Sequence, residues 1–498
     1  MSIPVPSIFG KTGFSTNIVV SFSTDDIVNN VGDLVAVGLA LGRRVSQSFI
    51  RQNLESRDRE LAEGRDKSRY RCKGKQQTSI KTVAGVVEFR RNVYIDNAVS
   101  EGSKFVHLLD EDLELEAIGQ IEREVCELAA ELACEGSYRA AARMITEMTG
   151  MSISPQGVWN VVQAIGEHRG DQIERHAELV RRGSSVGSIE TKLLYEENDG
   201  IWLKLQGRDR AEFGKSKEMK VGIAYDGATW ELCKGGKKRR TLDGKVAHAA
   251  FESASEFRRN KEGIIASRYD VGKIDLRIIT GDGANWIQKT GKSECICVLD
   301  EFHRNRKMIE CIRDPEFFQT AKTLLNENRI DDLLACIEAQ INSIVDEDEK
   351  KALRELLSYY KENKGAMTDP YSRGIEIPET REPGAIHHAR LGSMESNVFT
   401  IIGNRMKGRR SCWSIRGANN LARLLCLKHT TGLEGLFTGL EPLPPKALAP
   451  EYAEKPFSAS KAPKSAGSGT EFYHIASLPA TQWIKNVTGF QSFTELRI

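Results

Sequence analysis

The chain has 498 residues, of which 40% are hydrophobic and 28% charged, and its 71 basic and 69 acidic residues give a net charge of +2. At roughly 100–200 residues per domain this length predicts about three domains with a sizeable core, which excludes fibrous and wholly disordered classes. No apolar run of about 18 residues and no secretory signal is visible, so we expect neither a membrane span nor export. The 10 cysteines form no C-x-x-C pair, which favours reduced thiols in a cytoplasmic protein over disulfides or a zinc site.

The N-terminal region, residues 1–107, combines a helical pattern with a basic hairpin. Residues 79–83 and 86–90 are short runs rich in β-branched side chains on either side of Ala84-Gly85, and this pattern predicts a β-hairpin. Few acids interrupt the arginines and lysines of this segment. A solvated hairpin and a platform that contacts phosphates account for this charge equally well.

Residues 108–186 are predicted to be helical, with two short helices joined by a tight turn. The first helix follows Ser137, an N-cap candidate, and stops before Gly150, and the second begins at Pro155. The pattern fits an ordinary helical hairpin, and it also fits a DNA-binding helix-turn-helix. In the second case four side chains would face the DNA groove: Gln156, Trp159, Asn160 and Gln163.

From about Gly187 the pattern changes to strands. Five runs fit strands: residues 193–195, 201–205, 219–225, 276–280 and 295–299. With a helical segment between the third and the fourth, this order predicts an α/β domain with a mixed sheet. We assign the core to residues 187–303 and 391–430, a helical insertion to residues 304–390 and a flexible tail to residues 431–498.

Three acids are candidate metal ligands. Asp199 is predicted to end the first strand before a glycine turn, and Asp282 follows the strand 276–280 between two glycines. Glu395 lies near the start of a helix that would pack against the sheet. Carboxylate oxygens suit Mg²⁺ or Mn²⁺, and such ions can activate an attacking oxygen and stabilise the leaving oxygen of a phosphodiester. A plain turn residue is the alternative interpretation of Asp282.

Two further groups support phosphate chemistry. Asp300 and His303 stand three residues apart where a strand becomes a helix, so one helical turn brings them together, although a local N-cap with a surface histidine also fits. Arg405, Lys407 and Trp413 follow Glu395. Cations beside an aromatic ring fit phosphate contact with base stacking, although a tryptophan taken alone is more often a core residue.

These motifs together resemble bacterial insertion-sequence transposases of the ISLre type, which are relatives of the Mutator-like transposases. The resemblance extends from about Arg57 to His429, and the order and joint presence of its short pieces make it specific. The pieces are VEFRRNVY (87–94), LLDE (108–111), GSYRAAA (136–142), ISPQGV (153–158), DG (199–200), GDGANWI (281–287), LDEFH (299–303), MESNV (394–398) and RMKGR (405–409).

The resemblance implies an RNase H-like catalytic core whose acidic triad is Asp199, Asp282 and Glu395. Asp300 and His303 match the Asp/Cys-x-x-His motif that follows the second Asp in that group, and the helical stretch 304–390 matches its insertion. Glu196, Glu197 and Asp226 are nearby alternatives for the first position. The resemblance further implies Mg²⁺ (or Mn²⁺) held by the triad, double-stranded DNA from inverted repeats and target as the partner, and a homo-oligomer that pairs two ends.

We therefore expect an α/β (α+β) multidomain DDE transposase that cleaves and transfers DNA strands. The alternative is a repurposed or inactive transposase-derived protein that only binds a specific DNA sequence. Because all three acids are intact, the enzyme is favoured over a decayed copy. A resolvase-like nuclease of the RNase H class is disfavoured, because such enzymes are usually small and lack the N-terminal region and insertion.

Overall fold

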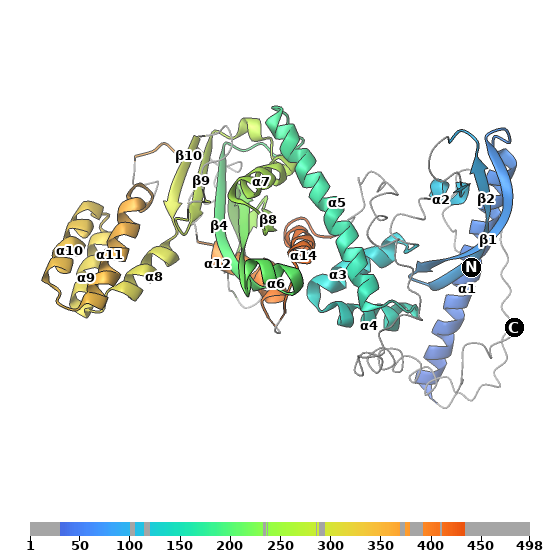
Figure 1. Ribbon diagram of the computed structural model, residues 1–498, viewed down its shortest axis with the longest axis horizontal. Coiled ribbons are helices and arrows are strands. Elements are labelled where there is room, and N and C mark those ends of the chain that lie inside the picture. Colours follow the sequence, from blue (N-terminus) through green and yellow to red (C-terminus); the bar gives the residue numbers. More distant parts are fainter. Residues whose placement is uncertain are drawn as a thin grey trace. The chain divides into compact units, whose positions relative to one another are not determined.

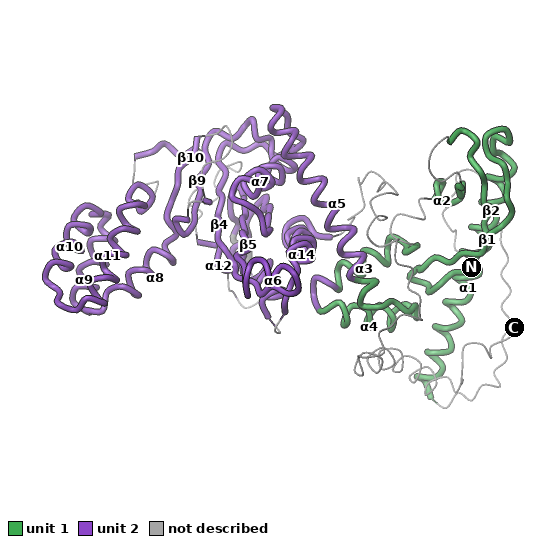
Figure 2. Tube along the Cα trace, in the orientation of Figure 1, with its two compact units in different colours: residues 1–132, 137–158, 437–498 green, residues 133–136, 159–436 purple. Residues whose placement is uncertain are grey.

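The computed structural model describes residues 30–99, 105–113, 120–232, 236, 238–284, 286–287, 294–368, 374–378, 392–408 and 411–433. The chain divides into two compact units (Figure 2). The first comprises residues 1–132, 137–158 and 437–498, and the second comprises residues 133–136 and 159–436. The predicted tail from residue 434 onward lies outside the described residues.

The first unit contains the predicted hairpin, which is confirmed. Helix α1 (Val31–Gly64) precedes β1 (Tyr70–Thr82) and β2 (Gly85–Asp96), which pair antiparallel, and the short β3 (Phe105–Val106) adds to β2. Leu54 of α1 packs against Val87 and Phe89 of β2. Asp58 accepts hydrogen bonds from the backbone N–H and side-chain amide of Asn92. The helix therefore covers one face of the hairpin.

Four helices follow: α2 (Leu108–Leu113), α3 (Arg123–Glu135), α4 (Tyr138–Thr149) and α5 (Pro155–Arg181). The predicted caps are confirmed, because Ser137 Oγ accepts from the N–H of Ala140 and Gly150 ends α4 with a φ of 70°. A left-handed residue at this position is most easily a glycine. The prediction of a short second helix is wrong, since α5 has 27 residues and continues from the first unit into the second.

The second unit is built around a mixed five-stranded sheet in the order β10-β9-β4-β5-β8 (Figure 1). Its strands are β4 (Leu193–Lys204), β5 (Ser216–Tyr225), β8 (Val246–Ala250), β9 (Leu276–Gly281) and β10 (Glu294–Leu299). The pairs β4–β5 and β5–β8 are antiparallel, whereas β9 runs parallel to both β4 and β10. The predicted mixed α/β organisation is therefore confirmed.

Shorter elements complete this part of the chain. They are α6 (Gly207–Phe213), the hairpin of β6 (Gly227–Leu232) and β7 (Lys238–Asp243), α7 (Ala254–Arg268) and a 3₁₀ turn (Val271–Lys273). Helix α7 connects β8 to β9 and begins with a capping box formed by Ser253 and Glu256.

The predicted strand break at Asp199-Gly200 is wrong. Strand β4 pairs with β5 without interruption, with Asp199 opposite Val221 and Gly200 opposite Lys220. A Cβ atom on Gly200 would lie 2.1 Å from Oε1 of Glu218. The glycine therefore makes room for a neighbouring side chain and does not form a turn.

The insertion is helical, as predicted, and has its own core. It contains α8 (Glu301–Cys311), α9 (Pro315–Asn326), α10 (Ile330–Ser343), α11 (Glu347–Glu362) and a 3₁₀ turn (Lys364–Ala366). Leu333, Ile337, Leu353 and Tyr360 are fully buried between these helices. Residues 369–373 and 379–391 of the predicted insertion lie outside the described residues.

A helical segment then returns the chain to the sheet. It runs through α12 (Met394–Val398), a π-helical turn (Phe399–Gly403) and α13 (Asn404–Met406), and α14 (Ile415–Lys428) follows. Helix α12 packs against β4 and β5, and α14 packs against β8. No helix in the described part of the chain is long and apolar enough to cross a membrane. No disulfide joins any cysteine in that part.

Candidate active site

Parallel pairing brings predicted acids from three strands to one end of the sheet. The register of β4 and β9 pairs Glu197 with Thr280. Asp199 and Asp282 each lie two residues further along, so they reach the same level. Asp300 directly follows β10, which is parallel to β9. The carboxyl ends of adjacent parallel strands lie at one edge, and this shared edge explains why the three carboxylates gather.

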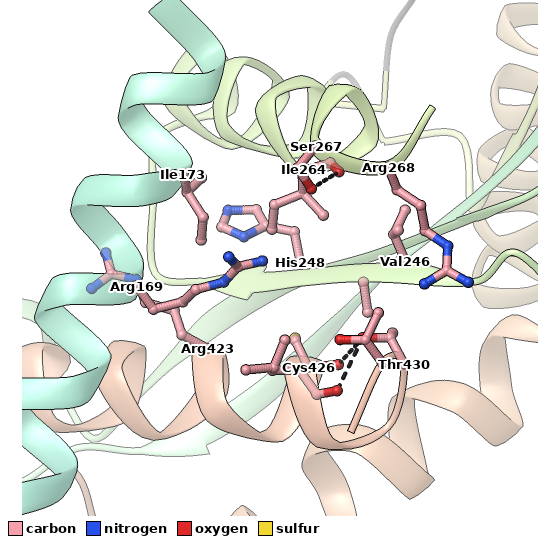
Figure 3. A pocket seen from close by; sticks show the side chains of 13 residues that line it. Arg169, Ile173, Val246, His248, Ile264, Ser267, Arg268, Arg423, Cys426 and Thr430 are labelled. Carbon is pink, nitrogen blue, oxygen red and sulfur yellow. Dashed lines mark hydrogen bonds between the residues drawn. The ribbon is translucent and has the colours of Figure 1, made fainter. Parts of the chain in front are cut away.

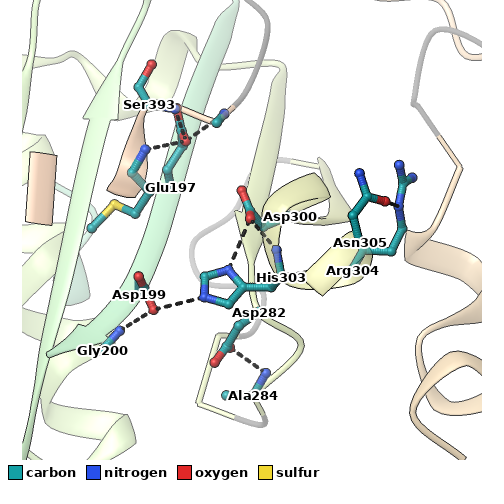
Figure 4. A network of polar contacts seen from close by, with 12 residues as sticks. Glu197, Asp199, Gly200, Asp282, Ala284, Asp300, His303, Arg304, Asn305 and Ser393 are labelled. Carbon is teal, nitrogen blue, oxygen red and sulfur yellow. Dashed lines mark hydrogen bonds and ion pairs between the residues drawn. The ribbon is translucent and has the colours of Figure 1, made fainter. Parts of the chain in front are cut away.

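His303 connects two of these carboxylates (Figure 4). Asp300 Oδ1 accepts a hydrogen bond from the backbone N–H of His303 and lies 3.0 Å from the ring Nδ1. The other ring nitrogen, Nε2, lies 3.9 Å from Oδ1 of Asp199. The hydrogen bond to Asp300 raises the pKa of His303, and the charge of Asp199 raises it further. The protonated imidazole is therefore favoured between the two acids.

The pKa of Asp199 is strongly raised. Burial raises its pKa to about 6, and the negative charges of Asp282 and Glu395 act in the same direction. A hydrogen bond from the N–H of Gly200 and the charge of His303 oppose this shift without cancelling it. Burial, and to a smaller extent the neighbouring carboxylates, therefore disfavours the ionised form of Asp199.

Glu197 holds the segment that leads to Glu395. Its buried Oε2 accepts hydrogen bonds from the backbone N–H groups of Gly392, Ser393 and Met394 at 3.0, 2.9 and 3.1 Å (Figure 4). Its Oε1 accepts from the Tyr225 hydroxyl at 2.6 Å. Sequence reasoning considered Glu197 only as an alternative first acid. The available signal was strand alternation, which puts residues 197 and 199 on one face of β4.

The other two alternatives for the first acid lie elsewhere. Glu196 is fully buried on the opposite face of β4, where it is ion-paired with Lys261 at 2.6 Å and with Arg277 at 3.0 Å. Asp226 follows β5, whose antiparallel direction puts it at the other end of the sheet. Of the candidates on this strand pair, Asp199 is therefore the one that joins Asp282 and His303.

The helical insertion contacts the loop that carries the second acid. The Tyr359 hydroxyl of α11 donates a 2.7 Å hydrogen bond to the backbone oxygen of Asp282. At Gly283, where φ is +89°, a Cβ atom would lie 2.8 Å from Oδ1 of Asn363. The insertion therefore positions Asp282 although it contributes none of the predicted ligands.

Trp413 and Arg405, which are predicted to contact DNA, form hydrogen bonds with the backbone of the second unit. Trp413 is 7% exposed, and its indole N–H donates to the backbone oxygen of Met406. The guanidinium of Arg405 lies over the Trp413 ring and donates to the backbone oxygen of Ala133. The structure thus corrects the prediction that Trp413 is an exposed stacking platform. Lys407 is exposed.

The residues predicted to read a DNA groove do not form one exposed set. Gln163 is buried, and its side-chain oxygen accepts a hydrogen bond from Asn420 of α14 at 2.8 Å. This placement corrects the prediction that Gln163 faces DNA. Gln156 and Asn160 are exposed, and Trp159 is half-buried. Gln156 belongs to the first unit, and the other three belong to the second.

The donor chemistry of the predicted triad fits a hard divalent cation. Asp199, Asp282 and Glu395 offer only oxygen atoms as ligands. Asp199, Glu395 and His303 line one small pocket. The negative charges of Asp282 and Glu395 also act on Asp199, and a bound cation would offset them. Within the described residues, however, no three His, Cys, Asp or Glu side chains are arranged closely enough to hold a metal ion.

Comparison with known proteins identifies the family. The model of the "Uncharacterised protein family (UPF0236)" matches residues 29–435. A UPF0236 protein of Caldanaerobacter subterraneus is 24% identical over 421 residues, which cover 82% of this chain and 80% of the relative. Another from the same organism, whose name gives eleven loci, is 25% identical over 403 residues, 79% of this chain and 77% of the relative. A UPF0236 protein from the vanSb 3′ region of Streptococcus gallolyticus is 21% identical over 416 residues, 82% of this chain and 84% of the relative. Because the family model covers most of its length, the chain belongs to the uncharacterised protein family UPF0236.

Proposed function

We propose that this protein is a DDE transposase that binds the ends of an insertion sequence and catalyses metal-dependent cleavage and transfer of DNA strands. The observation that carries the proposal is the gathering of Asp199, Asp282 and His303 at one end of the sheet, where the charge of Glu395 also acts on Asp199. Carboxylates that share one site and repel one another are expected where a cation assists phosphoryl transfer.

The sheet supports an RNase H-like core. Such a core has three antiparallel strands, then a helix, then two strands parallel to the first. The strands β4, β5 and β8, the helix α7, and the strands β9 and β10 follow that order and those directions. The first acid of an RNase H-like site lies on the first strand, and Asp199 lies on β4.

Each site residue has a role in this proposal. Asp199, Asp282 and Glu395 would hold Mg²⁺ or Mn²⁺, which when bound activates the attacking oxygen and stabilises the leaving oxygen. Asp300 orients His303 through Nδ1 and favours its protonated form, so that Nε2–H faces Asp199. The charged imidazole then offsets part of the carboxylate repulsion.

The names of the relatives support the proposal that the gene of this protein belongs to a mobile DNA element. One relative's name gives eleven loci in one organism, and another gives four. Repeated copies of one protein within a genome are what movement of its own coding DNA would leave behind. The same origin is proposed for this chain. Exposed Gln156, Asn160 and Lys407 would then be among the residues that contact the DNA ends and target.

A donor-plasmid assay tests the proposal. The DNA flanking the gene is placed around a marker, and excision and insertion are scored in cells that supply the protein. Asp282→Asn is compared with Asp275→Asn, a matched control because Asp275 precedes β9 and Asp282 follows it. We expect movement with wild type and with the control, and none with Asp282→Asn at equal abundance and equal DNA binding.

Two outcomes would count against the proposal. Movement with Asp282→Asn at the wild-type rate would remove Asp282 from the mechanism. Specific binding to the ends by wild type without any movement would favour the repurposed DNA-binding protein.

A further inference from the structure

The second unit contains a cavity of about 170 Å³ that the proposed function does not use (Figure 3). Its walls come from α5, β8, α7 and α14, and none of the acids of the candidate active site lines it. A cavity needs about 10–15 Å³ of such volume for one water molecule, so this one has room for a small polyatomic ligand.

The lining of this cavity is cationic. Arg169 comes from α5, Arg268 from the last turn of α7 and Arg423 from α14, and His248 of β8 lies between them (Figure 3). No aspartate or glutamate is among the lining residues. Three separate helices therefore contribute arginines to one cavity, where like charges repel unless an anion enters.

The hydrogen bonds of these arginines leave donors unused. Arg169 Nη1 donates to Gln172, and Arg423 Nη1 donates to Asn420 and to the backbone oxygen of Gly166. The buried Nε atoms of Arg268 and Arg423 have no hydrogen-bond partner among the described residues. Native structures rarely leave buried donors unsatisfied, so an ordered water or another acceptor is expected next to these N–H groups.

The protein's own carboxylates do not supply that acceptor. Glu252, a neighbour of Arg423, accepts hydrogen bonds from Asn260 at 2.9 Å and is paired with His248 at 3.0 Å. Burial lowers the pKa of Arg169, and no acidic side chain is among the groups that oppose this effect. Glu252, Glu174, Asp171 and Glu167 act on Arg423 through their charge, but none of these four carboxylates lines the cavity.

We propose that this cavity binds a phosphate group. Guanidinium groups match the geometry and charge of phosphate oxygens, and phosphate presents acceptors in several directions at once, as arginines on three helices require. The group would be free inorganic phosphate or the terminal phosphate of a DNA strand. The site is separate from the metal-dependent chemistry proposed above and does not depend on it.

Binding is tested on the full chain with inorganic phosphate as the probe. Calorimetric titration and thermal unfolding are compared in phosphate and in chloride of equal ionic strength. The main variant is Arg268→Gln, because the structure gives its Nε no partner to lose, and Arg423→Gln is the second. The matched control is Arg306→Gln on the exposed face of α8, outside the cavity.

We expect phosphate to bind wild type and the control equally, and both cavity variants at least tenfold more weakly. A 5′-phosphorylated oligonucleotide that competes with phosphate, where its 5′-hydroxyl counterpart does not, would identify a strand terminus as the source. Competition by neither would identify free phosphate. Absence of phosphate binding to wild type, or equal affinity in folded Arg268→Gln, would overturn the proposal.

Discussion

Replacing Asp199 by Asn tests whether burial and the neighbouring carboxylates disfavour the ionised form of Asp199 in the folded protein. The pKa of Asp199 is raised from 3.8 to about 6, chiefly by burial and then by Asp282 and Glu395. A carboxyl group with a raised pKa in the folded state stabilises the fold at low pH, and this stabilisation is lost as pH rises through the folded pKa. A shift of about two units corresponds to about 3 kcal/mol. The side chain is only 13% exposed, so solvent screening removes little of this.

Asparagine carries no charge at any pH and keeps an oxygen that can accept from the N–H of Gly200. In the presence of a chelator, the free energy of unfolding of Asp199→Asn should therefore rise relative to wild type between about pH 4 and about pH 7, by about 3 kcal/mol in total. The gain should appear in that window, because Asp199 becomes ionised there in the folded protein.

Urea unfolding followed by tryptophan fluorescence measures this difference. Five of the 6 tryptophans lie in the second unit, so the signal reports chiefly on the unit that contains Asp199. Glu212→Gln on the exposed surface of α6 is the control, and its difference from wild type should not depend on pH in this way. A difference between Asp199→Asn and wild type that stays flat across the window would refute the reasoning. Added Mg²⁺ at about pH 8 should then stabilise wild type more than the variant, since a bound cation relieves the repulsion.

Two further substitutions test how the acids are positioned. Glu197→Ala leaves three backbone N–H groups and the Tyr225 hydroxyl without their acceptor, so we expect a loss of roughly 3–5 kcal/mol in urea unfolding, against a smaller loss for Glu197→Gln, which keeps one oxygen. Equal stability of the alanine variant and wild type would contradict this role. Tyr359→Phe should cost about 1 kcal/mol and speed amide exchange in residues 281–284, because it removes the hydrogen bond to Asp282. The neighbouring Tyr360→Phe, whose hydroxyl bonds Arg304, should leave that loop unchanged, and identical exchange in both variants would sink the idea.

Sequence patterns predicted those features that local physics determines. The hairpin around Ala84-Gly85, the cap at Ser137 and the strand that ends before Asp282 each depend on a few adjacent residues. The helix that begins at Met394 and the all-helical insertion are likewise visible as local periodicity. The contact of Asp300 with His303 follows from helical spacing alone.

What the sequence could not predict depends on distant partners. The glycine at 200 suggested a turn, but it serves the Glu218 side chain on the neighbouring strand. Gln163 has the spacing of an exposed polar residue, but Asn420, far along the chain, pairs with it in the core. Trp413 suggested a stacking platform beside cations, but its N–H bonds Met406 and its ring is buried.

The same distant contacts explain how repelling carboxylates stay together. Asp282 and Glu395 are attached to segments on either side of a large insertion, and their negative charges repel that of Asp199. Tyr359 holds the backbone at Asp282, and buried Glu197 holds the backbone just before Glu395. Both restraints act on the backbone, so they leave the carboxylates available to a ligand. Glu197 and Asp199 lie on the same face of β4, so the contact of Glu197 with residues 392–394 links the position of Glu395 to that of Asp199. Helix α11 of the insertion fixes the position of Asp282 through Tyr359.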